Sequence, residues 1–362
     1  MSAKKPTMTD IAKLAGVSQS TVSNIVGGSK LSSFPKATVD KVLEAAKELN
    51  YTPRKKSRPD SREPQSKTIL VLAVKMTNPY YPFVLQSIER AARANGLHVV
   101  CGDTYYLPEM EKNYLELAVE QHFLAAIYLY PPVNAQALKK ANLLIPVITI
   151  CDNDRSALVD LVEMNNFKAG CLAAEHLLSL GHRKIAFLTN TIEGNLARTA
   201  RLAGIRHQMT DTPLECTLNV LSRKSISAEE AMSDNYDYNT GYHLAQDPTL
   251  YAQGNTAIVA INDMVALGAM DAVLEKGYRV PGDFSIIGFD NLLYTGFSRI
   301  SLTTVDNHAD LLAQSAMDVL LHRIHLSNSS TLVSEARFKI ECQPRLIVRN
   351  STAPLQEKAA QN

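Results

Sequence analysis

The chain has 362 residues, of which 46% are hydrophobic and 20% charged, a composition that excludes both wholesale disorder and a membrane protein. Its net charge of +1 is unevenly divided, because residues 1–67 hold 13 Lys and Arg against 6 Asp and Glu, whereas residues 68–362 hold 24 against 30. No secretion signal, membrane span or C-x-x-C pair is present, so we expect a cytoplasmic protein of two to three domains, at about 150 residues each, without a disulfide framework or zinc site.

Three short apolar patterns at helical spacing occupy the first 52 residues. Their apolar positions are Ile11, Leu14 and Ala15, then Val22, Ile25 and Val26, and finally Val39, Val42, Leu43 and Ala46. Thr7 and Asp10 form a capping box before the first pattern, and Ser18 opens the second. A compact three-helix head with an excess of basic residues is the outline of a nucleic-acid-binding module.

The second helical pattern has the most informative surface. Because Val22 and Ile25 must turn inward, four polar residues share the outward face: Gln19, Ser20, Ser23 and Asn24. Short uncharged hydrogen-bonding side chains can read base edges in a major groove. An ordinary solvated face is the alternative, but such faces usually carry Lys and Glu, and this face has neither. A helix-turn-helix head is therefore favoured.

Residues 53–67 read P-R-K-K-S-R-P-D-S-R-E-P-Q-S-K and contain no apolar side chain that could pack a core, so they are expected to be a linker. We accordingly place a helix-turn-helix domain at residues 1–52, the linker at 53–67, a body at 68–351 and a tail at 352–362.

The body alternates short β-branched runs with longer amphipathic segments. Strands are predicted at residues 68–74, 99–103, 125–129, 147–151, 184–188, 217–221, 257–261 and 285–289, and helices at 83–94, 109–121, 166–180 and 264–276. This alternation predicts an α/β fold with parallel sheet. Ligands on such sheets bind beyond the carboxyl ends of the strands, where Asn262 and Asp290 fall.

Several motifs carry a family resemblance. In the head they are T-D-I-A-K-L-A-G-V-S-Q-S-T-V-S at 9–23, T-V-D-K-V at 38–42 and L-N-Y-T-P at 49–53. In the body they are N-P-Y-Y at 78–81, H-L-L-S-L-G-H-R-K-I-A at 176–186, R-L-A-G at 201–204, N-D-M-V-A-L-G at 262–268, I-I-G-F-D at 286–290 and L-T-T-V at 302–305. From about residue 7 to 350 the chain resembles the lactose-repressor (LacI/GalR) family.

The resemblance implies a two-lobed body like that of periplasmic sugar-binding proteins, with lobe 1 at about 68–166 and 301–330 and lobe 2 at about 167–300 and 331–351. It also implies a sequence-specific transcriptional regulator, expected to be a repressor, that binds a pseudo-palindromic double-stranded DNA operator as a homodimer. A small polar effector, sugar-like, would bind between the lobes, and neither a cofactor nor a metal is implied.

The same resemblance implies two sets of contact residues. DNA contacts are expected from Thr9, Ser18, Gln19, Ser20, Thr21, Ser23, Asn24, Thr38, Tyr51, Arg54, Lys55, Lys56 and Arg58. Effector contacts are expected from Tyr80, Arg198, Arg201, Tyr236, Asn262, Asp290 and Asn307. On the residues alone, Arg201 and Asp290 could instead pair with each other across the lobes, and Tyr80 could be a packing residue.

The chain departs from the family pattern at three places. Cys151 stands where the family usually has Asp, and V-E-M-N-N at 162–166 replaces the usual Val-x-x-Asp-Asn. In the linker, Asp60 stands where other members have a leucine, and Pro59 comes just before it, so no hinge helix is expected there.

Arg198 and Arg201 lie three residues apart on one helix. This pair would suit an acidic or phosphorylated ligand.

Catalytic motifs give no support for an enzyme. The chain has no phosphate-binding G-x-x-x-x-G-K-[ST], no G-x-G-x-x-G, no G-x-S-x-G and no H-E-x-x-H, and its nine histidines do not cluster at ligand spacing. Two alternatives to a regulator remain, a cytoplasmic small-molecule-binding protein and an enzyme on the same doubly wound fold. The first leaves the head unexplained, and the second lacks a nucleophile motif.

Overall fold

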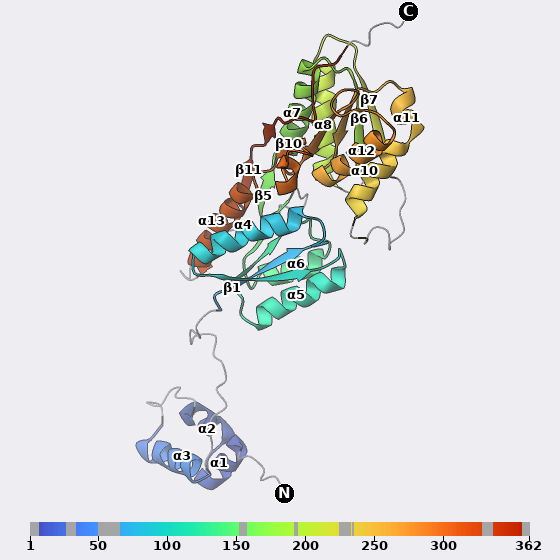
Figure 1. The fold of residues 1–362 in the computed structure, drawn as a ribbon. Helices are drawn as coiled ribbons and strands as arrows, with labels where there is room; N and C mark the ends of the chain where they lie inside the picture. Colours follow the sequence, from blue (N-terminus) through green and yellow to red (C-terminus); the bar gives the residue numbers. More distant parts are fainter. Residues whose placement is uncertain are drawn as a thin grey trace, which may run out of the picture. The chain divides into compact units, whose positions relative to one another are not determined.

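The chain divides into two units, residues Met1–Pro64 and Gln65–Asn362 (Figure 1). The computed structural model describes residues 7–26, 34–49, 66–151, 158–191, 195–223, 233, 235–327 and 336–356. The first unit is a helical head and the second is the α/β body.

The described residues of the head form three helices, α1 (Met8–Ala15), α2 (Gln19–Val26) and α3 (Lys36–Glu48). The capping box forms at the start of α1, where the Thr7 amide donates to Asp10 Oδ2 at 2.8 Å, and Gly16 ends the helix at a φ of 65°. Six apolar side chains form its core, namely Ile11, Ala12, Val22, Ile25, Val42 and Ala45. Leu14 and Leu43 were expected to face inward with them, but each is 49% exposed.

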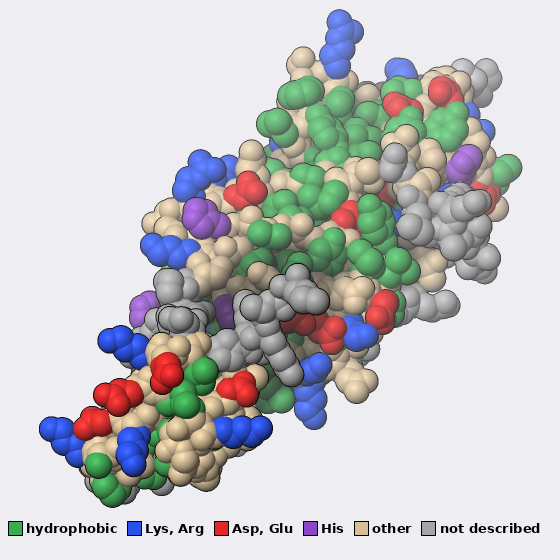
Figure 2. Space-filling model, turned by 90° about the horizontal axis from the view of Figure 1, so that it is seen from below, with side chains coloured by type: hydrophobic (Ala, Val, Ile, Leu, Met, Phe, Trp, Pro, Cys, Tyr) green, Lys and Arg blue, Asp and Glu red, His purple; other side chains and the backbone are tan. Residues whose placement is uncertain are grey.

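The described part of the head does not carry the predicted excess of positive charge. Residues 7–26 and 34–49 contain four lysines and four acidic residues, and the face of the head in Figure 2 shows both signs interspersed. Most of the excess therefore belongs to segments outside the described residues, including the linker.

The body contains two six-stranded sheets. The first has the order β11-β5-β4-β3-β1-β2 and the second β12-β10-β9-β8-β6-β7. The strands of the first are β1 (Thr68–Ala73), β2 (His98–Asp103), β3 (Ala125–Tyr128), β4 (Val147–Ile150), β5 (Asp160–Met164) and β11 (Lys339–Cys342). Those of the second are β6 (Lys184–Thr189), β7 (Thr217–Ser222), β8 (Ala257–Ala260), β9 (Ser285–Phe289), β10 (Thr303–Asp306) and β12 (Arg345–Ile347). Neighbouring strands are parallel except β10 and β12, and the strands predicted from sequence are all present.

Helices cover both faces of the first sheet, which with them forms lobe 1 (Figure 1). One face packs against α4 (Tyr80–Ala94) and α13 (Ala309–Ser327), and the other against α5 (Pro108–Glu120) and α6 (Ala135–Asn142). The continuous apolar runs of β1 and β3 follow from this burial on both faces.

The second sheet and its helices form lobe 2, which has a single apolar core. Its helices are α7 (Asn166–Ser179), α8 (Leu196–Thr210), α10 (Tyr236–Gln246), α11 (Pro248–Ala252) and α12 (Asp263–Glu275), with a 3-10 turn η2 (Leu293–Gly296). Glycines let these helices approach closely in pairs. A Cβ on Gly204 of α8 would lie 2.0 Å from the Phe167 carbonyl oxygen of α7, and one on Gly241 of α10 would lie 1.9 Å from the Val265 carbonyl oxygen of α12.

The structure corrects the expected division of the lobes near the carboxyl end. Residues 303–306 are β10, which pairs with β9 and so belongs to lobe 2 rather than lobe 1. Residues 339–342 are β11, which pairs with β5 and so belongs to lobe 1 rather than lobe 2. The chain therefore passes between the lobes three times: after β5, between β10 and α13, and between β11 and β12.

The expected tail is also shorter than the sequence indicates. The Leu355 amide donates to the Leu180 carbonyl at 2.8 Å, and the Ala353 carbonyl oxygen lies 3.1 Å from His182 Nε2. Residues 352–356 are thus attached to lobe 2 through backbone hydrogen bonds that a composition-based boundary could not reveal.

Candidate functional site

The second helix of the head begins with a hydroxyl cap. Ser18 Oγ accepts from the Thr21 amide at 3.1 Å and lies 2.7 Å from Ser20 Oγ and 2.8 Å from Thr21 Oγ1. This arrangement satisfies a backbone donor that the helix start would otherwise leave unpaired. It also fixes the first turn of α2, from which two of the predicted base-reading side chains project.

The outward face of α2 presents the residues that the sequence predicts. Gln19 and Ser20 are exposed, and Thr21, Ser23 and Asn24 are partly exposed, while Val22 and Ile25 are buried in the head core. The other head residues expected at DNA are also accessible, with Thr9 and Ser18 exposed and Thr38 partly exposed. The face combines short hydrogen-bonding groups without charge, which are able to read base edges.

The remaining DNA candidates cannot be placed in the same way. Tyr51, Arg54, Lys55, Lys56 and Arg58 lie outside the described residues, as do Pro59 and Asp60. The expected absence of a hinge helix therefore stays a prediction from the sequence.

In the body, a cavity of about 530 Å³ lies between the lobes, within the usual range of about 300–1,000 Å³ for ligand sites. It is lined by all of the residues predicted for effector contact: Tyr80, Arg198, Arg201, Tyr236, Asn262, Asp290 and Asn307. These residues are spread over more than half of the chain. The parallel sheets bring them together because the loops at the carboxyl ends of several strands meet at this place.

Arg201 is the most firmly held of the charged groups. Its side chain is only 8% exposed, and Nε donates to Asn166 Oδ1 at 2.7 Å while Nη1 donates to the Ile261 carbonyl at 2.6 Å. The guanidinium carbon lies 4.4 Å from the centroid of the Phe289 ring. Arg201 and Asp290 both belong to lobe 2, so they cannot form the pair across the lobes that the sequence left open.

Asp290 occupies a strained position at the end of β9. Its φ of 111° is rare for a residue with a side chain, and its Oδ1 accepts from Asn307 Nδ2 at 2.7 Å. Burial raises the pKa of the Asp290 carboxyl well above its usual range, with Arg201 acting in the opposite direction. A carboxyl that is readily protonated can both donate and accept hydrogen bonds, which suits recognition of hydroxyl groups.

A second buried carboxyl supports this end of the sheet. Asp263 is fully buried, and its oxygens accept from Thr304 Oγ1 at 2.6 Å and from the Leu292 amide at 2.9 Å. Burial raises the pKa of Asp263 to about 7. A Cβ on Gly288 would lie 2.3 Å from Asp263 Oδ1, so the strand needs glycine at this position.

Two contacts join the lobes across the cavity. Asn78 Nδ2 of lobe 1 donates to Asp237 Oδ2 of lobe 2 at 2.7 Å, and Asn190 Nδ2 donates to the other oxygen, Oδ1, at 2.6 Å. Lys75 Nζ of lobe 1 lies 4.3 Å from the centroid of the Tyr236 ring of lobe 2. Sequence reasoning missed Lys75 and Asp237, although each is next to a segment that it did single out.

Lobe 1 supplies most of the aromatic lining. Tyr80 and Tyr81 meet edge to face with ring centroids 5.5 Å apart, and Tyr106 and Tyr130 do so at 5.3 Å. All four line the cavity, as does Cys151, the residue that replaces the expected family carboxylate. Burial raises the pKa values of Tyr81 and Tyr106, which keeps both phenols protonated. These rings offer flat surfaces for a sugar ring or a base.

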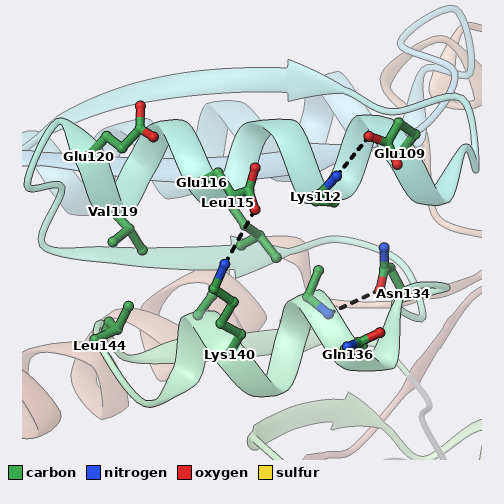
Figure 3. A pocket seen from close by; sticks show the side chains of 12 residues that line it. Glu109, Lys112, Leu115, Glu116, Val119, Glu120, Asn134, Gln136, Lys140 and Leu144 are labelled. Carbon is green, nitrogen blue, oxygen red and sulfur yellow. Dashed lines mark hydrogen bonds and ion pairs between the residues drawn. The ribbon is translucent and has the colours of Figure 1, made fainter.

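Another hollow of about 600 Å³ lies on lobe 1 between α5 and α6, and it differs in its chemistry (Figure 3). Its cations are paired with its own carboxylates: Lys112 Nζ with Glu109 Oε1 at 3.0 Å and Lys140 Nζ with Glu116 Oε1 at 3.5 Å. Both lysines of this groove are thus paired with its own glutamates, and it contains none of the predicted contact residues.

In the described segments no three His, Cys, Asp or Glu side chains gather as metal ligands. No helix among them is long and apolar enough to span a bilayer.

Known protein families match both the head and the body of this chain. Residues 7–54 match the family of bacterial regulatory proteins described as lacI family, and residues 174–352 match the periplasmic binding protein-like domain. Over 347 residues the chain is 28% identical to the HTH-type transcriptional repressor PurR of Haemophilus influenzae, which covers 95% of this chain and 98% of that protein.

Two solved structures show the same architecture. The lac repressor dimer bound to operator and the anti-inducer ONPF is similar with a TM-score of 0.65 and 25% identity, over 97% of this chain and 100% of that one. A LacI family transcriptional regulator from Enterococcus faecium with bound ribose is similar with a TM-score of 0.66 and 25% identity, over 80% and 100%. In this order the chain combines a lacI-family DNA-binding domain with a periplasmic binding protein-like domain, and along its whole length it is similar to LacI-family transcriptional regulators.

Proposed function

We propose that this chain is a cytoplasmic transcriptional repressor that binds its operator as a homodimer and is controlled by a small polar effector held between the lobes of its body. The observation that carries the proposal is the convergence of the seven predicted effector residues on one cavity of about 530 Å³. The name of the Haemophilus relative and the operator and ribose in the related structures support the same function.

Operator recognition falls to α2 in this proposal. Gln19, Ser20 and Asn24 read base edges in the major groove, and Thr21 and Ser23 face the phosphates. Thr9, Ser18 and Thr38 add hydrogen bonds to the backbone, which position the helix without specifying sequence.

A homodimer follows from the size of the reading surface. One eight-residue helix contacts too few base pairs for specific binding in a genome, whereas two heads related by a twofold axis read a pseudo-palindromic site. Sedimentation of the full chain at micromolar concentration is expected to show a dimer, and a monomer would contradict this part of the proposal.

Effector control uses the cavity as a site shared by both lobes. A ligand that contacts Tyr80 from one lobe and Asp290 and Asn262 from the other binds better when the lobes are closed together. This difference in affinity shifts the population of body conformations, and through it the DNA affinity of the heads. No cofactor or catalytic residue is needed for such a cycle.

The DNA-binding part is tested with duplexes selected from random sequence by the full chain. Mobility-shift assays then compare the full chain with residues 68–362. The full chain is expected to bind the selected duplexes and the body alone to bind none. Equal binding by both would disprove the role of the head.

The effector part is tested by calorimetry with a small molecule that changes the mobility shift. Arg201→Ala and Asp290→Ala are expected to lower its affinity about 30-fold or more, because each removes a buried polar partner. Arg206→Ala, on the exposed side of the same helix α8, is the matched control and should leave the affinity unchanged. Unaltered affinity in both cavity variants would remove the site.

A further inference from the structure

The cations of the body differ in how their charge is balanced. On the surface of lobe 1, Lys112 and Lys140 pair with glutamates of their own groove (Figure 3). In the interior, Arg323 forms a buried ion pair with Asp160 at 2.6 Å. In each case a carboxylate of the protein meets the positive charge, so no external anion is needed.

Two cations that line the cavity between the lobes have no such partner. Within the described residues, neither Lys75 nor Arg198 forms an ion pair with a carboxylate. Lys75 Nζ instead lies over the Tyr236 ring, and Arg198 Nη1 donates to the neutral Thr191 carbonyl at 2.6 Å. Both side chains are half-buried, where an unbalanced charge costs more than it would in water.

The acidic groups of the cavity wall are engaged elsewhere. Asp237 accepts from the amides of Asn78 and Asn190 with its two oxygens. Glu163 pairs with Lys339 at 2.7 Å, and Asp290 Oδ1 accepts from Asn307 Nδ2 at 2.7 Å. Burial lowers the pKa of Lys75, opposed by Asp237, and the positive charge of Arg198 lowers it further. Both cations line the same cavity, so an anion bound between them would be attracted by both charges.

Arg201 does not offer the same opportunity. Its guanidinium donates to Asn166 and to the Ile261 carbonyl and rests on Phe289, so it builds the wall of lobe 2. The sequence placed Arg198 and Arg201 together as a pair for an acidic ligand, but the contacts of the two residues separate their roles.

We propose that Lys75 and Arg198 form an anion subsite and that the effector is a polyhydroxylated small molecule carrying one acidic group, a phosphate monoester or a carboxylate. This inference rests on the proposed function, in which the cavity is the effector site. Lys75 follows β1 of lobe 1, and Arg198 lies in the first turn of α8 of lobe 2. An anion bound by both links the two lobes directly, so the acidic group is the part of the effector that favours closure.

The remainder of the cavity fits the uncharged part of such a molecule. Tyr80 and Tyr106 contribute aromatic rings to the lining, while Asn262 and Asp290 contribute polar groups beyond the ends of β8 and β9. A ring with several hydroxyls matches this mixture of flat apolar and polar surfaces.

The test uses the full chain and compares it with Lys75→Met, which keeps the length of the side chain and removes its charge. Lys112→Met is the matched control, because it removes one charge from the same lobe outside the cavity. The probes are inorganic phosphate, glucose 6-phosphate, ribose 5-phosphate, glucuronate, and the neutral sugars glucose and ribose, all at matched ionic strength. Calorimetry and the midpoint of thermal unfolding report binding.

At least one phosphorylated or carboxylated sugar is expected to bind more tightly than its neutral counterpart. Comparing the affinities of the sugar phosphates and of glucuronate shows whether the acidic group is a phosphate or a carboxylate. Lys75→Met should lower that affinity about 10-fold or more, the usual size of a lost charge-assisted hydrogen bond, and Lys112→Met should stay within twofold of the unaltered chain. Arg198→Lys, which keeps the charge, should lose less than Arg198→Gln.

Three results would overturn the subsite: no anion of the panel binds, a neutral sugar binds as tightly as its phosphate, or Lys75→Met binds the anions unchanged. The mobility shift without effector separates this failure from failure of the proposed function. It should be the same for the full chain and for Lys112→Met, and absence of DNA binding by the unaltered chain would count against the proposed function itself.

Discussion

The head and the body of this protein build their candidate sites in opposite ways. In the head, the predicted DNA-reading side chains lie within one turn and one helix, residues 18–24, and point away from a core of six side chains. In the body, the effector candidates are separated by more than two hundred residues and meet only because two sheets bring strand ends to one cavity. A local site depends on one helix, whereas an assembled site depends on the packing of the whole body.

The assembled site of the body contains buried carboxyls with raised pKa values. We therefore expect the stability of the body, but not that of the head, to depend on buried titratable groups. Asp263 has its pKa raised to about 7 from an ordinary value of 3.8, so its protonated form is favoured in the folded state. Its contribution is fully present below about pH 4 and is lost as the pH rises through 7. Asp263→Asn should flatten this fall in the free energy of unfolding, by at most about 4 kcal/mol at about 1.4 kcal/mol per pKa unit.

Urea unfolding at several pH values between 4 and 8 measures the effect. Asp40→Asn, at an exposed position of α3 in the head, is the control and should retain the pH dependence of the unaltered protein. The same slope in Asp263→Asn and in the control would show that this carboxyl does not carry the dependence.

Helix packing gives the next largest effect. Gly204→Ala places a methyl group 2.0 Å from the Phe167 carbonyl oxygen, so α8 must move away from α7. The expected loss is about 1–3 kcal/mol in the free energy of unfolding of the body, despite the better helix propensity of alanine. Ala203→Ser, at an exposed neighbouring position, is the control, and a stabilised Gly204→Ala would mean that the two helices separate at little cost.

A change at the head should leave the body untouched. Asn24→Ala is expected to cost about 1–3 kcal/mol of DNA affinity, concentrated at one operator position, because a base contact discriminates only at its own base pair. Binding to a set of duplexes with single substitutions measures this loss, and effector affinity should not change. Equal weakening on every duplex would assign Asn24 to backbone contacts.

The smallest change in operator preference is expected from the linker. Replacing Arg54, Lys55, Lys56 and Arg58 by alanine should lower affinity for all sequences alike and reduce the slope of log K against log salt by up to about four units. The reason is that we expect these basic residues to contact phosphates and not bases. A slope that does not change, or a sharp central kink in the bound DNA, would contradict this description of the segment.

Much of the fold could be predicted, because local patterns encode it. Capping at Thr7 and Asp10, the buried face of α2 and the apolar strands of both sheets all follow from spacing and composition. The strands β10 and β11 could not be assigned to their lobes from the sequence. The pattern of a short strand predicts its secondary structure, but the sheet that it joins depends on partner strands far along the chain.

The candidate site shows the same difference between what local patterns predict and what depends on distant contacts. The residues expected at the effector line the cavity, and their contact with an effector stays a prediction, whereas Lys75 and Asp237 were not found from the sequence. Lys75 follows a buried strand at a φ of 52°, and Asp237 stands in the first turn of α10, where an acidic residue is ordinary. Their importance arises from contacts with the opposite lobe, which no pattern within one segment contains.

The three passages of the chain between the lobes have a consequence for how the gene can be shortened. Neither lobe corresponds to one continuous stretch of codons, because α13 and β11 complete lobe 1 and β10 and β12 complete lobe 2 after most of both have been made. A premature stop before residue 303 would therefore remove strands from both sheets at once, and no single cut yields an intact lobe. A protease that severs one passage, by contrast, leaves two others to hold the halves together, so a nicked body should migrate as one particle until it is denatured.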